Sequence, residues 1–321
     1  MFSLVFVEKL GENPVNDSQT GLKKESLLSI QQLMESLSHQ HVPTSTLYVI
    51  ATPIGNIGDI SLRALHILGV ADLIACEDTR TSRQLLSGYG LSSELVSAHK
   101  HNEREAAGYL IERLKKGERI ALVSDAGTPA VSDPGARIVD AVREAGLNVV
   151  PVPGSSAAIT ALSASGLLDD HFLFYGFLPT KNTQRKDLLK TLTDTRATLI
   201  FYEAPHRIEE TLNALADVFE PERRIVIARE LTKLFEEIHR CTMAEVMDWF
   251  KSDPNHKKGE FVLLVEGAQP VSDDINTESQ RVLSILMQEL PVSTAASLTA
   301  KITGNKKNHL YELALQLKQE K

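Results

Sequence analysis

The chain has 321 residues, of which 42% are hydrophobic and 24% charged, with 18 glycines and 13 prolines. This composition is typical of a globular protein long enough for two domains, and it excludes fibrous, collagenous and wholly disordered proteins. Acidic residues outnumber basic ones and give a formal charge of −8, so any nucleic-acid site must be local. The two cysteines, Cys76 and Cys241, form no CxxC pair, which disfavours disulfides and structural zinc and fits a reducing compartment.

The amino-terminal segment differs from the rest of the chain. Residues 1–7 are apolar, but Glu8 and Lys9 follow at once, so the stretch is too short for a signal-peptide core. No window approaches the roughly 20 apolar residues of a membrane span. We therefore expect a cytoplasmic protein that does not cross a membrane. Residues 1–44 are rich in Ser, Gln, Asn and Glu, which predicts a poorly ordered extension with at most one weak helix.

From residue 45 onward, apolar runs alternate with helical periods, as in a parallel sheet with crossover helices. The first strand, LYVIA, leads into the loop TPIGNIGD and a helix for which Asp59 is the expected N-cap. The remaining elements of this half are the strands ADLIACED, RIALVSD and NVVPV, helices near 107–114 and 138–145, and a helix that begins in PGSSAAITAL.

A boundary is expected near Gly166–Asp170, after which strands and helices alternate again and the chain ends in a polar linker and three short helices. The predicted strands of the second half are FLFYGF, TLIFYE, RIVIARE, a short polar strand and EFVLLVEG, with helices at 208–219 and near Trp249. The predicted class is α/β, with two α/β domains and a trihelical, helix-turn-helix-like segment. The predicted divisions are 1–44, 45–166, 167–268 and 269–321, and the last segment divides into helices at 279–290, 293–303 and 306–317.

The loop TPIGNIGD lies between a strand and a helix, which is where open α/β sheets bind ligands. As a dinucleotide fingerprint it fails, because Gly55 and Gly58 give GxxG and Pro53 occupies the turn. A dinucleotide site is nevertheless an alternative, because the acids Glu77 and Asp78 stand about 20 residues on, where a ribose-binding acid would lie. A tight turn with no ligand is the other alternative.

Two further loops are rich in residues that expose backbone. SDAGTPAVSDPG (Ser124–Gly135) combines Gly, Pro, Asp, Ser and Thr, so it offers many amides and carbonyls and few bulky side chains. PVPGSSAAI (Pro151–Ile159) opens a helix whose first amides are unpaired within the helix. Each loop alone could be ordinary turn chemistry, but both at strand ends of one sheet predict a site for a polar small molecule.

Charged residues follow two strands directly. Glu77, Asp78 and Arg80 end the second strand, and Glu203 and His206 end a strand of the second half. They could line a cleft and move or position a proton; the alternatives are solvated ion pairs and a surface histidine. His99 and His101 stand two residues apart on an expected strand, which does not give the i, i+4 spacing of a helical metal site.

The chain contains, in this order, the segments TPIGNIGDIS, ACEDTRTS, SDAGTPAVSDPG, PVPGSSA, FYGFLP, FYEAPHR and ARELTKLFEE. These seven segments are similar to those of the ribosomal RNA small subunit methyltransferase I family, a branch of the tetrapyrrole methylase superfamily. The resemblance runs from about Leu47 to Gly267, and the trihelical tail resembles that family's appended helical domain. At AGTP the chain has Thr128 where many tetrapyrrole enzymes have Asp, a departure typical of the RNA branch.

The resemblance implies S-adenosylmethionine held between two α/β domains and 2′-O-methylation of a cytidine in the decoding region of small-subunit (16S) rRNA. It also implies a homodimer that acts on rRNA or the small ribosomal subunit. Methyl transfer needs an in-line approach and a dry cleft but no metal, and a ribose hydroxyl benefits from a base. The expected catalytic residues are Glu77, Asp78, Arg80, Glu203 and His206. The expected cofactor-binding residues are Pro53, Gly55, Asp125, Gly127, Thr128, Pro129, Val131, Ser132, Asp133, Ser155, Ser156 and Ala157.

Two other functions share some of these features. A tetrapyrrole C-methyltransferase would have the same fold and cofactor, but it has no need of a tail whose residues 301–321 carry five lysines against two glutamates. A DNA-reading sensor would place a tail helix in the major groove; the apolar residues of the last helix, such as Leu310, Leu313 and Leu317, argue instead for a core role.

Overall fold

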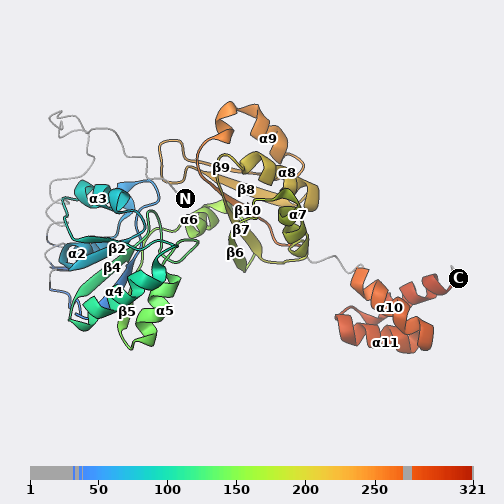
Figure 1. The fold of residues 1–321 in the computed structure, drawn as a ribbon. Coiled ribbons are helices and arrows are strands. Elements are labelled where there is room, and N and C mark those ends of the chain that lie inside the picture. Colours follow the sequence, from blue (N-terminus) through green and yellow to red (C-terminus); the bar gives the residue numbers. More distant parts are fainter. Residues whose placement is uncertain (1–31, 33–35, 38, 270–276, 320–321) are drawn as a thin grey trace. The chain divides into compact units, whose positions relative to one another are not determined.

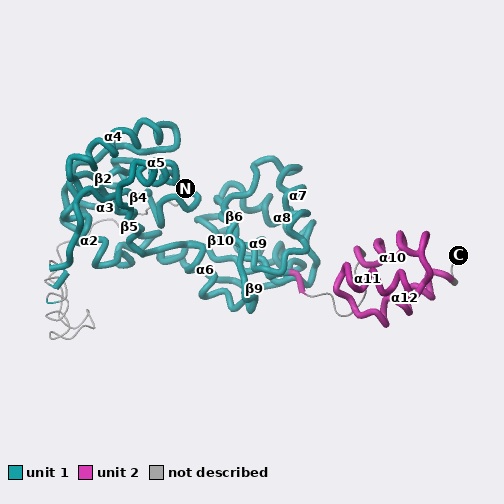
Figure 2. Tube along the Cα trace, turned by 90° about the horizontal axis from the view of Figure 1, so that it is seen from below, with its two compact units in different colours: residues 1–267 teal, residues 268–321 magenta. Residues whose placement is uncertain are grey.

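The computed structural model describes residues 32, 36, 37, 39–269 and 277–319. It divides into two compact units, Met1–Gly267 and Ala268–Lys321, which are coloured separately in Figure 2. The predicted poorly ordered extension falls mostly outside the described residues. Within the described part of the chain, no helix has both the length and the apolar character needed to cross a membrane.

The first sheet is parallel throughout and has the strand order β3-β2-β4-β1-β5. Its carboxyl ends therefore share one edge, as expected for a ligand-binding α/β sheet. The strands are β1 (Thr46–Ile50), β2 (Leu73–Cys76), β3 (Leu95–Ser97), β4 (Arg119–Val123) and β5 (Asn148–Val152).

Helices cover both faces of this sheet, as Figure 1 shows. On one face Leu47 and Ile120 pack with Leu110 and Ile138 of two helices. On the other face buried strand residues pack against Ile67. The helices are α2 (Leu62–Val70), α3 (Thr79–Gly88), α4 (Glu103–Lys115) and α5 (Ala136–Glu144).

The expected cap of the first helix is wrong. Ser61, not Asp59, is the N-cap of α2, and its hydroxyl accepts a hydrogen bond from Ala64 N at 3.1 Å. Asp59 instead ends a short 3-10 helix, Ile57–Asp59, whose cap is Asn56. Both residues are good caps, but only Ser61 immediately precedes the helical residues.

The second sheet is mixed, with the order β6-β7-β10-β8-β9. Only β6 and β7 are parallel, because β10 runs antiparallel between β7 and β8, and β8 and β9 form an antiparallel pair. The parallel pattern expected from the alternation therefore holds for the first half alone. The strands are β6 (Phe172–Phe177), β7 (Thr198–Glu203), β8 (Arg224–Arg229), β9 (Glu237–Thr242) and β10 (Phe261–Val265).

One face of the second sheet is covered by three helices and the other by a single one. Phe201 and Leu263 point toward the three-helix side, where they pack with Leu189, Leu212 and Phe250. On the opposite face Ala157 and Ala161 pack with Ile200 and Val226. The helices are α6 (Ala157–Ser165), α7 (Asn182–Thr191), α8 (Ile208–Val218) and α9 (Val246–Ser252), followed by a 3-10 helix, Pro254–Lys257.

The second unit holds the three helices predicted for the tail, α10 (Thr277–Glu289), α11 (Val292–Thr303) and α12 (Lys307–Gln319). Its small core consists of Leu283, Ala295, Ala296, Leu310 and Ala314. Gly304, at φ +78°, ends α11 in the left-handed conformation that glycine adopts without strain. The boundary predicted between residues 166 and 167 in the first unit stays a prediction.

Candidate functional site

A narrow cavity lies where the strand-end loops of the first sheet meet the ends of β6 and β7. Backbone-rich loop residues form one part of its wall, and two aromatic side chains, Phe177 and Tyr202, form another. Its lining residues are Ile54, Ala126, Gly127, Thr128, Val131, Ser132, Asp133, Ser156, Ala157, Phe177 and Tyr202.

The loop Ser124–Gly135 owes its shape to contacts at both ends. Gly127 exchanges two backbone hydrogen bonds with Thr52, at 2.9 and 3.0 Å, and so joins the loop to the end of β1. The carboxylate of Glu103, buried at the start of α4, accepts a hydrogen bond from Gly135 N at 2.7 Å. Ala130 and Ser132 take left-handed φ values of 68° and 63°, which L residues adopt only at a cost.

Seven of the predicted cofactor-binding residues lie in the cavity wall, and five lie beside it. Those in the wall are Gly127, Thr128, Val131, Ser132, Asp133, Ser156 and Ala157. Those beside it are Pro53, Gly55, Asp125, Pro129 and Ser155. The sequence interpretation missed Ile54, Ala126, Phe177 and Tyr202, although FYGFLP and FYEAPHR were recognised as motifs.

Gly55 serves a close approach between two segments of the first unit. A Cβ at this position would lie 2.6 Å from Lys233 Cγ and 2.8 Å from Thr232 Oγ1. The neighbouring Asn56 N donates to Thr232 Oγ1 at 3.1 Å. The loop after β1 is thereby tied to the segment that follows β8, and this leaves no room for a side chain at Gly55.

Acidic groups gather behind and within the cavity wall. Burial, reinforced by the charge of Asp125, raises the pKa of Glu77. Burial also raises the pKa of Asp125, whose Oδ1 accepts from Asp78 N at 3.1 Å. Burial and the nearby Glu77 raise the pKa of Asp133 to about 6. A carboxyl that titrates close to neutrality can exchange a proton under working conditions.

Asp78 and Arg80 form the ion pair that was the alternative interpretation. Arg80 Nη2 lies 2.8 Å from Asp78 Oδ2, and its side chain is 87% exposed. Asp78 also caps α3 by accepting from Arg80 N at 2.8 Å. Hydrogen bonds from Arg80 lower the pKa of Asp78 to about 2, so this carboxylate stays charged and is a poor proton acceptor.

Neither Glu203 nor His206 is in the cavity wall. Glu203 is buried and accepts hydrogen bonds from Thr211 Oγ1 at 2.6 Å and from Ala204 N at 2.8 Å. His206 is exposed in the turn before α8. His99 and His101 lie in a turn rather than on the expected strand, with ring centroids 6.0 Å apart. Among the described residues, no group of three His, Cys, Asp or Glu side chains could hold a metal ion.

The raised pKa of Asp133 predicts a pH-dependent stability. The native state holds its proton more tightly than the unfolded chain, so the stabilisation from the protonated carboxyl is complete below about pH 4 and is lost as the pH rises through about 6. Asp133→Asn cannot ionise. Its free energy of unfolding should therefore rise relative to wild type by up to about 2 kcal/mol between about pH 4.5 and about pH 7.5, as measured by urea unfolding.

The exposed Asp140 on α5 provides the control for this measurement. Asp140→Asn should change the unfolding free energy by nearly the same small amount at both pH values. A difference between wild type and Asp133→Asn that does not vary with pH would contradict the assignment.

Two family models match the chain. Residues 46–247 match Tetrapyrrole (Corrin/Porphyrin) Methylases, and residues 273–318 match the RsmI C-terminal HTH domain. Solved structures agree on the fold. The chain superposes with a TM-score of 0.51 and 18% identity on a cobalt precorrin-4 methyltransferase, covering 71% of this chain and 98% of that one. It superposes with a TM-score of 0.50 and 21% identity on a uroporphyrin-III-C-methyltransferase from Thermus thermophilus, covering 69% of this chain and 94% of that one.

Curated relatives are similar over nearly their whole length. Ribosomal RNA small subunit methyltransferase I from Pseudomonas aeruginosa is 52% identical over 273 residues, which cover 84% of this chain and 97% of that protein. The protein of the same name from Escherichia coli O157:H7 is 48% identical over 280 residues, 87% of this chain and 98% of that protein. Because family models match both of its segments and these relatives are about half identical to it, the chain belongs to the ribosomal RNA small subunit methyltransferase I family of tetrapyrrole methylases.

Proposed function

We propose that this protein transfers a methyl group from S-adenosylmethionine to the ribose 2′-hydroxyl of a cytidine in the decoding region of small-subunit rRNA. The observation that carries the proposal is the identity of about half the residues with relatives named for this rRNA, along almost the full length of those relatives. The target atom and the cytidine come from the family resemblance. A homodimer, usual in the superfamily, is part of the same proposal.

The cavity has the chemistry that S-adenosylmethionine requires. A sulfonium cation is favoured by a carboxylate and by aromatic faces, and Asp133, Phe177 and Tyr202 all line the cavity. The polar ends of the cofactor need backbone donors and acceptors, which the loop around Gly127 provides. Gly127 lies at φ +80° and a Cβ there would meet Ile54 Cγ2 at 3.4 Å, so the wall is shaped around the missing side chain.

In the proposed site the cofactor supplies an electrophilic methyl group. Gly127, Thr128, Ser132, Ser156 and Ala157 would hold it. The protein contributes orientation, the exclusion of water and the handling of one proton. Tyr202, 6% exposed, accepts a hydrogen bond from Ala158 N at 3.1 Å and so fixes the aromatic wall to the start of α6.

The proton of the ribose hydroxyl needs an acceptor. Burial raises the pKa of Glu77, whereas hydrogen bonds from Arg80 lower that of the neighbouring Asp78. The charge of Glu77 also acts on Asp133 in the cavity wall. We assign the acceptor role to Glu77, directly or through Asp133. Asp78, Arg80, Glu203 and His206 remain candidates for orienting the RNA or the loops.

The experiment that tests the function is incubation of the protein with methyl-labelled S-adenosylmethionine and three acceptors in parallel. These are naked small-subunit rRNA, small ribosomal subunits and a porphyrin precursor. Label in rRNA or in the subunits, recovered after digestion as 2′-O-methylcytidine, supports the proposal. Label in the porphyrin would favour the tetrapyrrole alternative, and a base-methylated nucleoside would exclude the ribose as the acceptor.

The tail is expected to bind RNA. Lys301, Lys307 and Lys318 are exposed on α11 and α12, and lysines that neutralise phosphates release counterions. A chain truncated after Gln269 should keep its affinity for S-adenosylmethionine, because the first unit ends at Gly267 and has its own cores. Its affinity for rRNA should fall, and so should the salt dependence of that affinity, measured by filter binding at several salt concentrations.

A charge variant of the full chain separates electrostatics from loss of the fold. Replacing Lys301, Lys307 and Lys318 together by Gln should lower the slope of log K against log salt by about 2 to 3 if each contacts a phosphate. The exposed Lys115 and Lys116 at the end of α4 serve as the matched control pair. Equal affinity and equal slope for the truncated and the full chain would rule out a role for the tail in RNA binding.

A further inference from the structure

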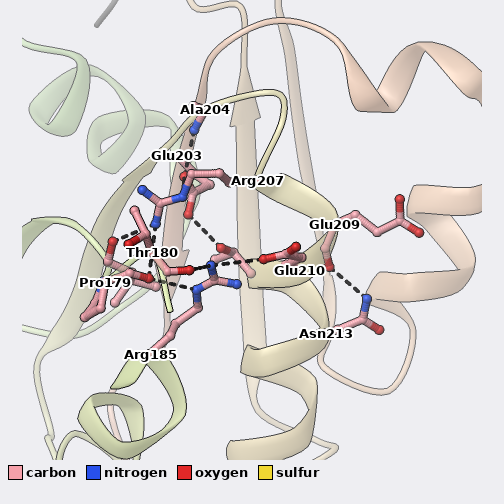
Figure 3. A network of polar contacts seen from close by, with 11 residues as sticks. Pro179, Thr180, Arg185, Glu203, Ala204, Arg207, Glu209, Glu210 and Asn213 are labelled. Carbon is pink, nitrogen blue, oxygen red and sulfur yellow. Dashed lines mark hydrogen bonds and ion pairs between the residues drawn. The ribbon is translucent and has the colours of Figure 1, made fainter. Parts of the chain in front are cut away.

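Two arginines converge on the turn that follows β6, as Figure 3 shows. Arg185 of α7 is fully buried; its Nε donates to Pro179 O at 3.2 Å and its Nη2 to Thr180 O at 3.1 Å. Arg207, which precedes α8, donates from Nη2 to Leu178 O at 2.6 Å and to Pro179 O at 3.3 Å. The carbonyls of three consecutive residues, 178–180, are therefore held by two guanidinium groups.

Glu203 forms an ion pair with one of these arginines. Its Oε1 lies 3.2 Å from Arg207 Nε, an ion-pair contact without hydrogen-bond geometry, and the carboxylate is further fixed by Thr211 Oγ1 and by Ala204 N. The Glu203 side chain is completely buried and the Arg207 side chain is 15% exposed, so water competes little with this ion pair. The ion pair holds the guanidinium beside the carboxylate, and Glu203 itself is not among the residues that line the cavity.

Arg185 lacks an equivalent buried partner. Its ion-pair partner, Glu210, is 67% exposed, and among the residues that the structure describes its Nη1 has no hydrogen-bond partner. Burying a cation without full compensation lowers stability. The contacts that Arg185 does make are to the 178–180 turn, which points to the shape of that turn as the role of the residue.

The turn directly follows Phe177, the last residue of β6, which is in the cavity wall. Phe177 lines the cavity and packs edge-to-face on Tyr202, with ring centroids 5.7 Å apart. β6 is an edge strand paired with β7, and its register shifts between Phe174 and Gly176. A strand that is held from one side and interrupted by a bulge fixes its end weakly, so Phe177 depends on what holds the residues after it.

We propose that Arg185 and Arg207, the latter paired with Glu203, are positioning residues that clamp the 178–180 turn and thereby set Phe177 in the wall of the cofactor cavity. This inference rests on the proposed function in taking that cavity as the cofactor site. Arginine suits the role because its planar fork donates to several acceptors at once, whereas lysine presents a single compact ammonium.

The test compares Arg207→Lys with a matched control, Arg223→Lys. The Arg223 side chain is 4% exposed, against 15% for Arg207, and it donates to three backbone carbonyls, those of Glu266, Thr193 and Thr195, none of which belongs to a cavity residue. Both variants keep the positive charge but lose the planar guanidinium group, which donates to several acceptors at once. Three quantities are measured on each full chain: the melting temperature, hydrogen exchange of residues 172–182 without ligand, and the dissociation constant of S-adenosylmethionine by calorimetry.

Both variants should melt at lower temperature, but the other two quantities should separate them. In Arg207→Lys, exchange at residues 172–182 should rise at least about tenfold, because hydrogen bonds to a charged group are lost. If the turn is then correctly placed in about one molecule in ten, S-adenosylmethionine should bind about tenfold more weakly. Arg223→Lys should leave exchange at 172–182 and the affinity unchanged.

A double-mutant cycle tests the link to the aromatic wall. Phe177→Leu should also weaken binding, and adding Arg207→Lys to it should weaken binding by much less than about tenfold, because both changes act through the same side chain. Fully additive losses, or equal exchange in the two arginine variants, would overturn the clamp. A wild-type chain that does not bind S-adenosylmethionine counts against the proposed function, and the ligand-free exchange result then decides the clamp by itself.

Discussion

Replacing Gly127 by valine should abolish the binding of S-adenosylmethionine, with a loss of affinity of at least about 100-fold, or about 2.7 kcal/mol. The position lines the cavity and lies at φ +80°. A Cβ would make ordinary van der Waals contact with Ile54 Cγ2 at 3.4 Å and Ser155 O at 3.8 Å, so the expected loss comes from the two further methyl groups of valine, which would extend from a residue that lines the proposed site. Isothermal titration calorimetry on the folded variant measures the loss.

A second glycine separates lost space from backbone strain. Gly146 has a similar φ of +71°, but a Cβ there would meet nothing within 4 Å. Gly146→Val should therefore be destabilised by the strained backbone to a comparable extent, as judged by its melting temperature, and should bind the cofactor as wild type does. Unchanged affinity in a folded Gly127→Val protein would show that the cofactor lies elsewhere.

Glu77→Gln should lower the single-turnover rate of methyl transfer by about 10²- to 10⁴-fold while leaving cofactor affinity nearly intact, since this is the range that general-base assistance contributes. Glu77 follows β2 at the carboxyl-end edge of the first sheet, and burial together with Asp125 raises its pKa. The wild-type rate should accordingly fall as the pH drops through that raised pKa, and the variant should lose this dependence.

Asp72 precedes the same strand at its opposite end, where it accepts a hydrogen bond from Arg119 N at 2.7 Å, so Asp72→Asn is the matched control and should react at the wild-type rate. The remaining predicted catalytic residues are tested by Asp78→Asn, Arg80→Ala, Glu203→Gln and His206→Ala. Arg80→Ala should weaken RNA binding if the exposed guanidinium contacts phosphate. Rates within about threefold of wild type for all five site variants would contradict acid–base assistance by this cluster.

The loop Ser124–Gly135 could be predicted to border a cavity because its composition is unusual for any purely structural segment, and six of its residues line one. Ile54 and Tyr202 could not be predicted, because an apolar residue that touches a ligand has the same sequence context as one that fills a core. Indeed, both also belong to a buried cluster with α6 residues. Tertiary contacts, not local pattern, place them in the cavity wall.

The charged candidates illustrate a different limit. Sequence places Glu77 and Glu203 identically, each directly after a buried strand. In the structure a Thr hydroxyl, a backbone amide and Arg207 surround Glu203, whereas Glu77 lies near three other carboxylates, those of Asp78, Asp125 and Asp133. The partner of Glu203 on α8 is eight residues away, in a helix whose rotation the sequence does not specify, so the two environments could not be distinguished beforehand.

The left-handed backbone at Ala130 and Ser132 has a consequence for how this protein can change over time. These residues would favour other conformations if the loop were free, so the remainder of the first unit, through Thr52 and Glu103, imposes the shape. A substitution at Glu103 would thus alter ligand affinity without contacting ligand. Conversely, Ala130→Gly would make the left-handed native backbone easier to adopt, but it would also give the unfolded loop more conformations. In the proposed cofactor site, thermal stability and cofactor affinity would therefore change together whenever this loop is altered.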